Sequence, residues 1–394
     1  MKNLLLATAA VCVFASALAA QGKFPLKYQV AEESLGAIVQ MTTQAYGAAP
    51  APPDVLKNVP KDLPSQTAYA QAVIGGQRVW MIIAAGDPPK LYLDASGKGD
   101  FSGAKAVEGK AEPGRLTFAS VEVPQANGAA ARVRVTAHAP DKDQPPQFVV
   151  VSAAGCLLGE VRLGDKAYRV AIVDGDTNGR YAPASAPALG PRGTDGLAID
   201  LNGDGRFDPP SLEKDEWEWM PLAKGLCVGG TYWAMEVAAD RASVEVKKVS
   251  PPMGAIEAKP GVDLRAFGDY GLSWIRPTGG KVQFPAGTYM PVVTMLTKND
   301  DAGTPWMLRS SGGDQPFEVP ADGTLALPIG PPLVTKVAVQ QRERTVSVDL
   351  ALVGQAGEQY APGAMKGKER MPPPKLEIVD EAGKVLQTGQ FEYG

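Results

Sequence analysis

Short apolar segments separated by two-residue turns recur along this chain and limit it to an antiparallel β architecture. Residues 68–74 and 78–84 are rich in apolar and β-branched side chains and are joined by Gly75-Gly76, a dipeptide typical of tight hairpins. Gly164-Asp165 lies in the same way between residues 157–163 and 168–173. Two-residue loops connect antiparallel strands, whereas parallel strands need a long crossover. We therefore expect an all-β fold, with an antiparallel sheet domain over residues 66–250.

The C-terminal part continues this pattern. In residues 266–394, alternating segments are separated by turns about every 8 to 12 residues, which predicts a β-sandwich. Within it, Pro285-Ala-Gly-Thr-Tyr289 resembles a strand entry of transthyretin-like and other immunoglobulin-like modules, and this resemblance implies an immunoglobulin-like sandwich. Residues 354–374, rich in Gly, Pro and Lys, are expected to form a mobile loop. The proline-containing residues 251–265 are expected to be a linker between the two domains.

The N-terminus has the pattern of a secretory signal peptide. Lys2 precedes an apolar run over residues 4–18, and Ala17-Leu18-Ala19 fits the small-residue rule for signal peptidase. We expect cleavage after residues 1–19 and export to the periplasm or the extracellular space; an uncleaved anchor is the alternative. The run is short for a membrane span and no later segment replaces it, so no transmembrane span is expected after cleavage.

Residues 20–65 are expected to be an N-terminal segment. It has a weakly helical pattern over residues 31–46 and then a proline-rich linker or strap over residues 48–64.

Composition and missing motifs exclude several function classes. The formal charge of −4 gives no basic footprint for nucleic acid. His138 is the one histidine, which excludes zinc sites built from several histidines, and alternation places it on the polar face of its strand. No Cys-x-x-Cys pair and no phosphate-binding loop before a helix is found. Catalysis by a pair of carboxylates stays open, but no catalytic set is recognisable.

The most informative motif runs from Ile199 to Asp208. Asp200, Asn202 and Asp204 place oxygen-bearing side chains at positions 1, 3 and 5 of a calcium loop. Gly205 stands at position 6, where a sharp turn is needed, and the carbonyl of Arg206 falls at position 7. Asp208, at position 9, adds a further carboxylate. Hard cations such as Ca²⁺ prefer this oxygen-only ligand set.

A second copy lies earlier in the chain. Asp174, Asp176 and Asn178 occupy positions 1, 3 and 5, Gly179 position 6 and Arg180 position 7. A degraded copy begins at Asp94, but Lys98 brings an ammonium to position 5, which favours a plain turn there over a metal site. The first two copies therefore predict two calcium sites.

These two loops resemble the EF-hand-like calcium loops of dockerins and thrombospondin type 3 repeats. They also resemble loops found in many exported bacterial β proteins. The resemblance implies calcium binding through the side chains of Asp174, Asp176, Asn178, Asp200, Asn202 and Asp204 and through the carbonyls of Arg180 and Arg206. The chain departs from the EF-hand at position 12, where Ser185 and Ser211 replace the bidentate glutamate. Glu213 or Asp215 could supply the missing ligand of the later loop. Asp, Asn and Gly also gather wherever turns need them, so a metal-free turn is the alternative.

Cys156 and Cys227 are the two cysteines beyond the signal peptide. An even pair in an exported chain predicts a disulfide, and two buried thiols are the alternative.

Trp217 and Trp219 would point to the same side of an extended segment, either to stack on a sugar or to cover a core edge. The sequence thus favours an exported, calcium-binding β protein with a structural, adhesive or assembly role, whose partner is an envelope protein or a glycan. The alternative is a carbohydrate-binding module or a carboxylate-based glycoside hydrolase.

Overall fold

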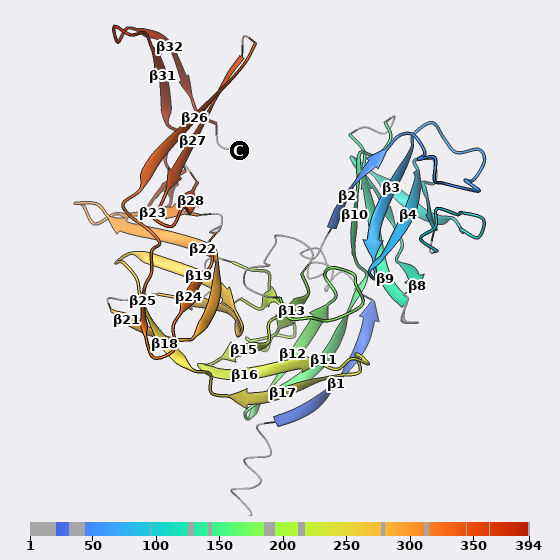
Figure 1. Ribbon diagram of the computed structural model, residues 1–394, viewed down its shortest axis with the longest axis horizontal. Coiled ribbons are helices and arrows are strands. Elements are labelled where there is room, and N and C mark those ends of the chain that lie inside the picture. Colours follow the sequence, from blue (N-terminus) through green and yellow to red (C-terminus); the bar gives the residue numbers. More distant parts are fainter. Residues whose placement is uncertain are drawn as a thin grey trace, which may run out of the picture. The chain divides into compact units, whose positions relative to one another are not determined.

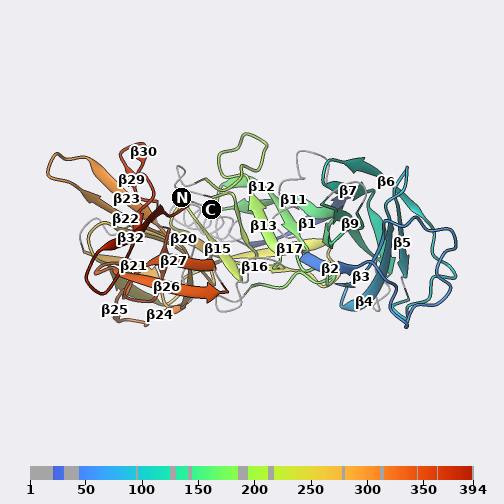
Figure 2. The same cartoon turned by 90° about the horizontal axis from the view of Figure 1, so that it is seen from above.

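The computed structural model describes residues 21–30, 44–94, 96–124, 130–140, 144–184, 194–211, 217–276, 280–310, 315–343, 345–361 and 363–392. These residues contain strands and no helix, and nearly all of the strand pairings are antiparallel (Figures 1 and 2). The predicted all-β fold class is therefore confirmed. The described residues divide into two compact units, unit 1 up to Lys248 and unit 2 from Val249.

The first sheet of unit 1 has nine strands in the order β10-β2-β3-β4-β5-β6-β7-β9-β8, and a further pairing of β10 with β9 closes it. The strands are β2 (Gln44–Ala49), β3 (Thr67–Ile74), β4 (Gln77–Ala84), β5 (Lys90–Asp94), β6 (Val107–Glu112), β7 (Arg115–Phe118), β8 (Val121–Pro124), β9 (Ala130–His138) and β10 (Phe148–Ala153). Alternate side chains point inward, so Val79, Met81 and Ile83 are fully buried in one apolar core.

The predicted hairpin of β3 and β4 is present. Ile74 pairs with Gln77, so Gly75 and Gly76 form a two-residue turn. Their φ angles are 62° and 77°, in the left-handed region that glycine enters without steric cost.

The second sheet of unit 1 has eight strands in the order β14-β13-β12-β11-β1-β17-β16-β15. The strands are β1 (Gln21–Val30), β11 (Gly155–Leu163), β12 (Lys166–Val173), β13 (Gly196–Ile199), β14 (Trp219–Pro221), β15 (Gly225–Val228), β16 (Thr231–Val237) and β17 (Ser243–Val249). Strand β1 lies within the segment expected to precede the sheet domain. Its first half pairs with β17 and its second half with β11, so it joins the two halves of this sheet.

Two expectations for residues 20–65 can be compared with the structure. Residues 31–43 lie outside the described part of the chain, but the end of the expected helix is wrong, because Gln44–Ala49 is the strand β2. The proline-rich segment is a strap on the first sheet and not a free linker. Its Leu56, Val59 and Leu63 pack against the buried Tyr69 and Phe101.

Unit 2 contains four smaller sheets, with orders β21-β18-β25, β20-β19-β22-β23-β29-β30 with β24 beside β22, β26-β27-β28, and β31-β32. The strands are β18 (Met253–Glu257), β19 (Val262–Gly268), β20 (Gly271–Ile275), β21 (Lys281–Pro285), β22 (Gly287–Asn299), β23 (Pro305–Arg309), β24 (Phe317–Val319), β25 (Thr324–Ala326), β26 (Val334–Arg342), β27 (Thr345–Val353), β28 (Gln359–Tyr360), β29 (Met365–Lys366), β30 (Glu369–Arg370), β31 (Lys375–Val379) and β32 (Val385–Gln390). Its core is built from the strands between β18 and β25 and from Leu327 and Ile329.

Two predicted irregular segments of this unit are wrong. Residues 251–265 are not a linker, because β18 pairs with β21 and β25 and buries Ala255 and Ile256. Residues 354–374 contain β28, β29 and β30. Within them Glu358 is buried and accepts hydrogen bonds from the backbone N–H of Gly330 and from the Tyr360 hydroxyl.

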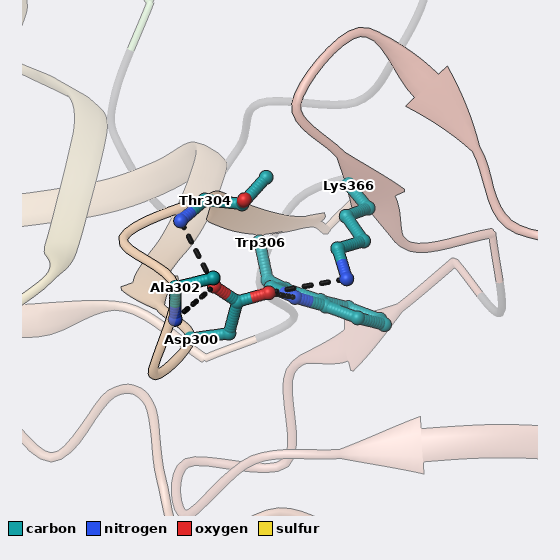
Figure 3. Close-up of polar contacts among 5 residues, drawn as sticks. All are labelled: Asp300, Ala302, Thr304, Trp306 and Lys366. Atoms are coloured by element: carbon teal, nitrogen blue, oxygen red, sulfur yellow. Dashed lines mark hydrogen bonds and ion pairs between the residues drawn. The ribbon is translucent and has the colours of Figure 1, made fainter.

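The turn between β22 and β23 is held to β29 by one carboxylate (Figure 3). Asp300 accepts the backbone N–H of Ala302 at 3.1 Å and of Thr304 at 2.9 Å through one oxygen, and the Trp306 indole N–H at 3.2 Å through the other. The Lys366 ammonium lies 3.1 Å from that second oxygen. These hydrogen bonds stabilise the carboxylate and lower the pKa of Asp300 to about 2.

The predicted immunoglobulin-like sandwich over residues 266–394 is not shown, because two of its ribbons leave an apolar face in solvent. The β26–β27 ribbon is labelled in Figure 1. It pairs Val337 with Leu350 and Val339 with Val348, and strand alternation puts these four side chains on one face. Val337 is 57% and Val339 63% exposed. In the β31–β32 ribbon, Leu386 is also 63% exposed. A sandwich would bury such faces between two sheets.

No helix in the described ranges is long and apolar enough to cross a membrane. The expected signal peptide, residues 1–19, lies outside the described residues.

Candidate metal centre

The loop after β12 is arranged around the carboxylate of Asp174. One of its oxygens accepts the backbone N–H of Asn178 at 3.0 Å, and the other accepts that of Gly179 at 2.8 Å. Asp176 also accepts the Asn178 N–H at 3.0 Å, and the Asn178 side-chain oxygen accepts the N–H of Arg180 at 2.7 Å. Gly179 has a φ of 76°, as the sharp turn at position 6 requires. The side-chain oxygens of Asp174, Asp176 and Asn178 thus all accept backbone N–H groups within one tight turn.

Asp195 joins this loop from the other side of a β-ladder. Strands β12 and β13 pair with Val173 opposite Gly196, so the next residues in the same register are Asp174 and Asp195. Asp195 accepts the backbone N–H of Gly175 at 2.9 Å and of Ala182 at 2.7 Å. These bonds fix its carboxylate beside the loop.

Asp174, Asp176 and Asp195 together form an acidic triad. Each offers a carboxylate oxygen, and these atoms lie within 4.8 Å of one another. Asp195 is 4% exposed, and the other two are partly buried. Within the described ranges, this is the one group of three or more His, Cys, Asp or Glu side chains close enough together to hold a metal ion.

Burial and mutual repulsion disfavour the charged forms of Asp174 and Asp195. The pKa of Asp195 is raised to about 7, first by burial and then by the nearby Asp176 carboxylate. The pKa of Asp174 is raised in the same direction by burial, and further by Asp195 and Asp176. Three carboxylates in this space therefore need protons or a cation to offset their charge. An oxygen-only group suits hard cations, and Asn178 and the Arg180 carbonyl are the further ligands that the loop motif predicts.

In the later loop, which begins at Asp200, side-chain oxygens again accept backbone N–H groups, but a different residue holds the loop ends together. Asp200 accepts the N–H of Gly203 at 2.7 Å and of Gly205 at 2.9 Å. Asn202 accepts the N–H of Asp204 at 2.8 Å, and Asp204 accepts that of Arg206 at 2.8 Å. The Asp200, Asp204 and Asp208 carboxylates are not gathered into an acidic group like the triad.

Glu218 closes this later loop. Its buried carboxylate accepts the backbone N–H of Leu201 at 3.0 Å and of Asn202 at 3.2 Å through one oxygen, and that of Asp208 at 2.7 Å through the other. Glu213 and Asp215, which the sequence suggested for this role, lie outside the described residues, as does Ser185 of the earlier loop. Of the predicted position-12 residues, Ser211 is described, and its carbonyl accepts the indole N–H of Trp217 at 2.6 Å.

The degraded copy at Asp94 forms an ordered turn although it lacks a full set of calcium ligands. Asp94 is 2% exposed and accepts the N–H and hydroxyl of Ser96 at 2.9 and 2.6 Å and the N–H of Gly99 at 2.5 Å. Lys98 is exposed at position 5. Hydrogen bonds to one aspartate hold this turn, so turn geometry alone does not indicate a cation.

The predicted disulfide is not formed: no bond joins Cys156 and Cys227. Cys156 lies on β11 and Cys227 on β15, which are separated by β1, β17 and β16. Four strand spacings of about 4.8 Å put them roughly 19 Å apart along the sheet, well beyond the reach of a disulfide. The two cysteines flank the two loops in the sequence, but they do not lie near each other in the fold.

The other side chains that the sequence singled out, His138 and Trp219, pack against neighbouring side chains. The His138 ring stacks on Phe148 with centroids 4.5 Å apart, and burial together with Arg115 lowers its pKa. Its neighbours on β9 alternate between buried and partly exposed, which confirms its place on the polar face. Trp219 is buried beside Cys156 and Phe207 and so serves the core.

Comparison with protein-family models, curated proteins and solved structures finds no match to this chain. Its function therefore has to be argued from the site and the surfaces themselves.

Proposed function

We propose that this chain is an exported, calcium-binding β protein with a structural, adhesive or assembly role. The observation that carries the proposal is the acidic triad of Asp174, Asp176 and Asp195, whose ligand oxygens lie within 4.8 Å of one another. A cation held there links the loop after β12 to the start of β13. The ion would thus stabilise the β12–β13 hairpin and the sheet around it.

The chemistry of the triad favours calcium among the common metals. It contains no histidine or cysteine, which Zn²⁺ prefers, and its ligands are hard oxygens. Mg²⁺ demands a tight octahedron and keeps much of its water. Ca²⁺ takes 6 to 8 oxygens in a flexible geometry, which suits side chains, a backbone carbonyl and water together.

The exposed apolar ribbons support the assembly part of the proposal. Val337 and Val339, on the β26–β27 ribbon, and Leu386, on the β31–β32 ribbon, are each more than half exposed. A two-stranded ribbon has little stability of its own, and clustered exposed apolar side chains mark surfaces that bind other molecules. The signal-peptide pattern of residues 1–19 supports a periplasmic or extracellular location.

Thermal unfolding in chelator and in millimolar calcium tests the calcium proposal. Ligand present at 100 times its Kd stabilises a protein by ~2.7 kcal/mol, which corresponds to about 5–10 °C in Tm for a unit of this size. We expect this gain in the wild type and in Asp94→Asn, which changes a similar loop outside the triad. Asp195→Asn should lose it. An equal Tm of the wild type in both buffers would overturn the proposal.

A further inference from the structure

Unit 1 contains a cavity of about 420 Å³ between its two sheets. The walls come from β1, β9, β10 and β11, from the loop after β12, and from the turn between β16 and β17. Hydrogen bonds hold the walls together: the Ala154 N–H donates to the Arg132 carbonyl at 2.8 Å, and the Gln44 amide donates to the Asp176 carbonyl at 2.9 Å. Its volume lies within the usual range for small-molecule sites, about 300–1,000 Å³.

Tyr28 provides a flat aromatic surface in this cavity. Its ring lies over Gly155, because a side-chain carbon added at residue 155 would stand 2.8 Å from Cζ of the ring. Tyr28 is nevertheless 43% exposed, so part of the ring remains accessible where it lines the cavity. An aromatic ring of this kind offers an apolar face together with a polar hydroxyl edge.

Charged groups of both signs surround that ring. Arg132 and Arg241 line the cavity together with Asp240 and with Asp174, a member of the triad. Arg132 also forms an ion pair with Glu122. The carboxylates of Glu122 and Asp240 offset the two arginine charges without any contribution from Asp174. The walls therefore have no excess of positive charge to attract an anion, but they offer many strong hydrogen-bond donors and acceptors.

We propose that this cavity binds one unit of a neutral sugar. A pyranose has a face of C–H groups that packs on an aromatic ring, and hydroxyls around its edge that both donate and accept hydrogen bonds. The Tyr28 ring would pack on the C–H face of the sugar. The arginine and aspartate side chains would form hydrogen bonds with its hydroxyls. The binding rests on the cavity walls and does not depend on the calcium proposal, although Asp174 belongs to both sites.

Saturation-transfer NMR with methyl glycosides of glucose, galactose, mannose and N-acetylglucosamine tests this proposal. We expect at least one of them to bind in chelator as well as in calcium. Tyr28→Ala should weaken that binding tenfold or more, whereas Tyr28→Phe keeps the ring and should retain it. Phe148→Ala removes a similarly exposed ring outside the cavity and should leave binding unchanged.

Asp240→Asn gives a second variant at an exposed turn, in case Tyr28→Ala does not fold, and should weaken binding threefold or more. Inorganic phosphate and glycine serve as an anionic and a zwitterionic probe, and neither should bind. The proposal is overturned if no glycoside binds, if binding needs calcium, if phosphate or glycine binds instead, or if neither Tyr28→Ala nor Asp240→Asn weakens the interaction.

Discussion

Asp195 lies directly opposite Asp174 in the continued register of strands β12 and β13, with ligand oxygens within 4.8 Å although 21 residues separate the two in sequence. The pairing of a buried with a partly buried carboxylate across a ladder costs stability unless their charge is offset. Each of them also accepts two backbone N–H groups, which holds the pair in place. The calcium proposal therefore predicts that the stability of unit 1 depends on pH and on cations.

The calcium effect should increase with pH. Since the folded state keeps a proton on Asp195 up to about pH 7, and the unfolded chain loses it near its ordinary value of 3.8, the folded state binds more protons between these values. The free energy of unfolding in chelator should therefore fall as pH rises through this window, by on the order of 4 kcal/mol at 1.36 kcal/mol per pKa unit.

A bound calcium ion would offset the carboxylate charge that those protons neutralise. The difference in Tm between calcium and chelator should therefore be small near pH 5 and large near pH 8. Calorimetric scans at several pH values in both buffers measure this difference. In Asp195→Asn the dependence should be weaker, because only the raised pKa of Asp174 then remains. A calcium effect that is constant across this range would contradict the account.

Glu218 should stabilise the later loop without contributing to the calcium effect. Its buried carboxylate accepts three backbone N–H groups, and Glu218→Ala leaves them without this acceptor, at a cost of about 1–3 kcal/mol. Asp204→Ala, at an exposed position of the same loop, should cost no more than about 0.5 kcal/mol. Urea unfolding in chelator gives both values. A loss of calcium stabilisation in Glu218→Ala would show that the later loop, and not the triad, is the main site.

Sequence reasoning reached the fold class because alternation and turn chemistry act locally. Gly75 and Gly76 specify their hairpin through backbone conformations that few other residues adopt. The same reasoning missed β1 and the strand β18, because each is held by partners distant in sequence. Residues 251–265 contain prolines and read as a linker, yet β18 pairs with β21 and β25.

The sequence predicted the ligand residues within the loops but not the carboxylates that reach the loops from other segments. Asp174, Asp176 and Asn178 follow a spacing that a single loop imposes, so the motif identifies them. Asp195 and Glu218 come from outside their loops, and their positions depend on strand register. The signal for Asp195 was present in the apolar segments before Asp174 and after Asp195, which pair as β12 and β13. A register drawn for that hairpin would have placed the two aspartates opposite each other.

The two cysteines should both be reduced in the folded protein. Because Cys156 and Cys227 lie on strands four spacings apart in one sheet, unfolding without reductant should make both available to a thiol reagent, as mass spectrometry of the labelled peptides would show. Before unfolding, the fully buried Cys156 should react far more slowly than Cys227, since burial shields it and raises its pKa to about 11. A peptide pair linked through the two sulfurs would contradict this sheet order.

Calcium titration by isothermal calorimetry, on chelator-stripped protein near pH 8, tests the central claim most directly. The wild type and Asp94→Asn should bind calcium with the same affinity at the triad. Asp195→Asn should lose that site or weaken it at least tenfold, a change of about 1.4 kcal/mol, while keeping a folded unit 1. Calcium binding of unchanged affinity and stoichiometry in Asp195→Asn, or no binding by the wild type, would contradict the assignment of the triad as a calcium site.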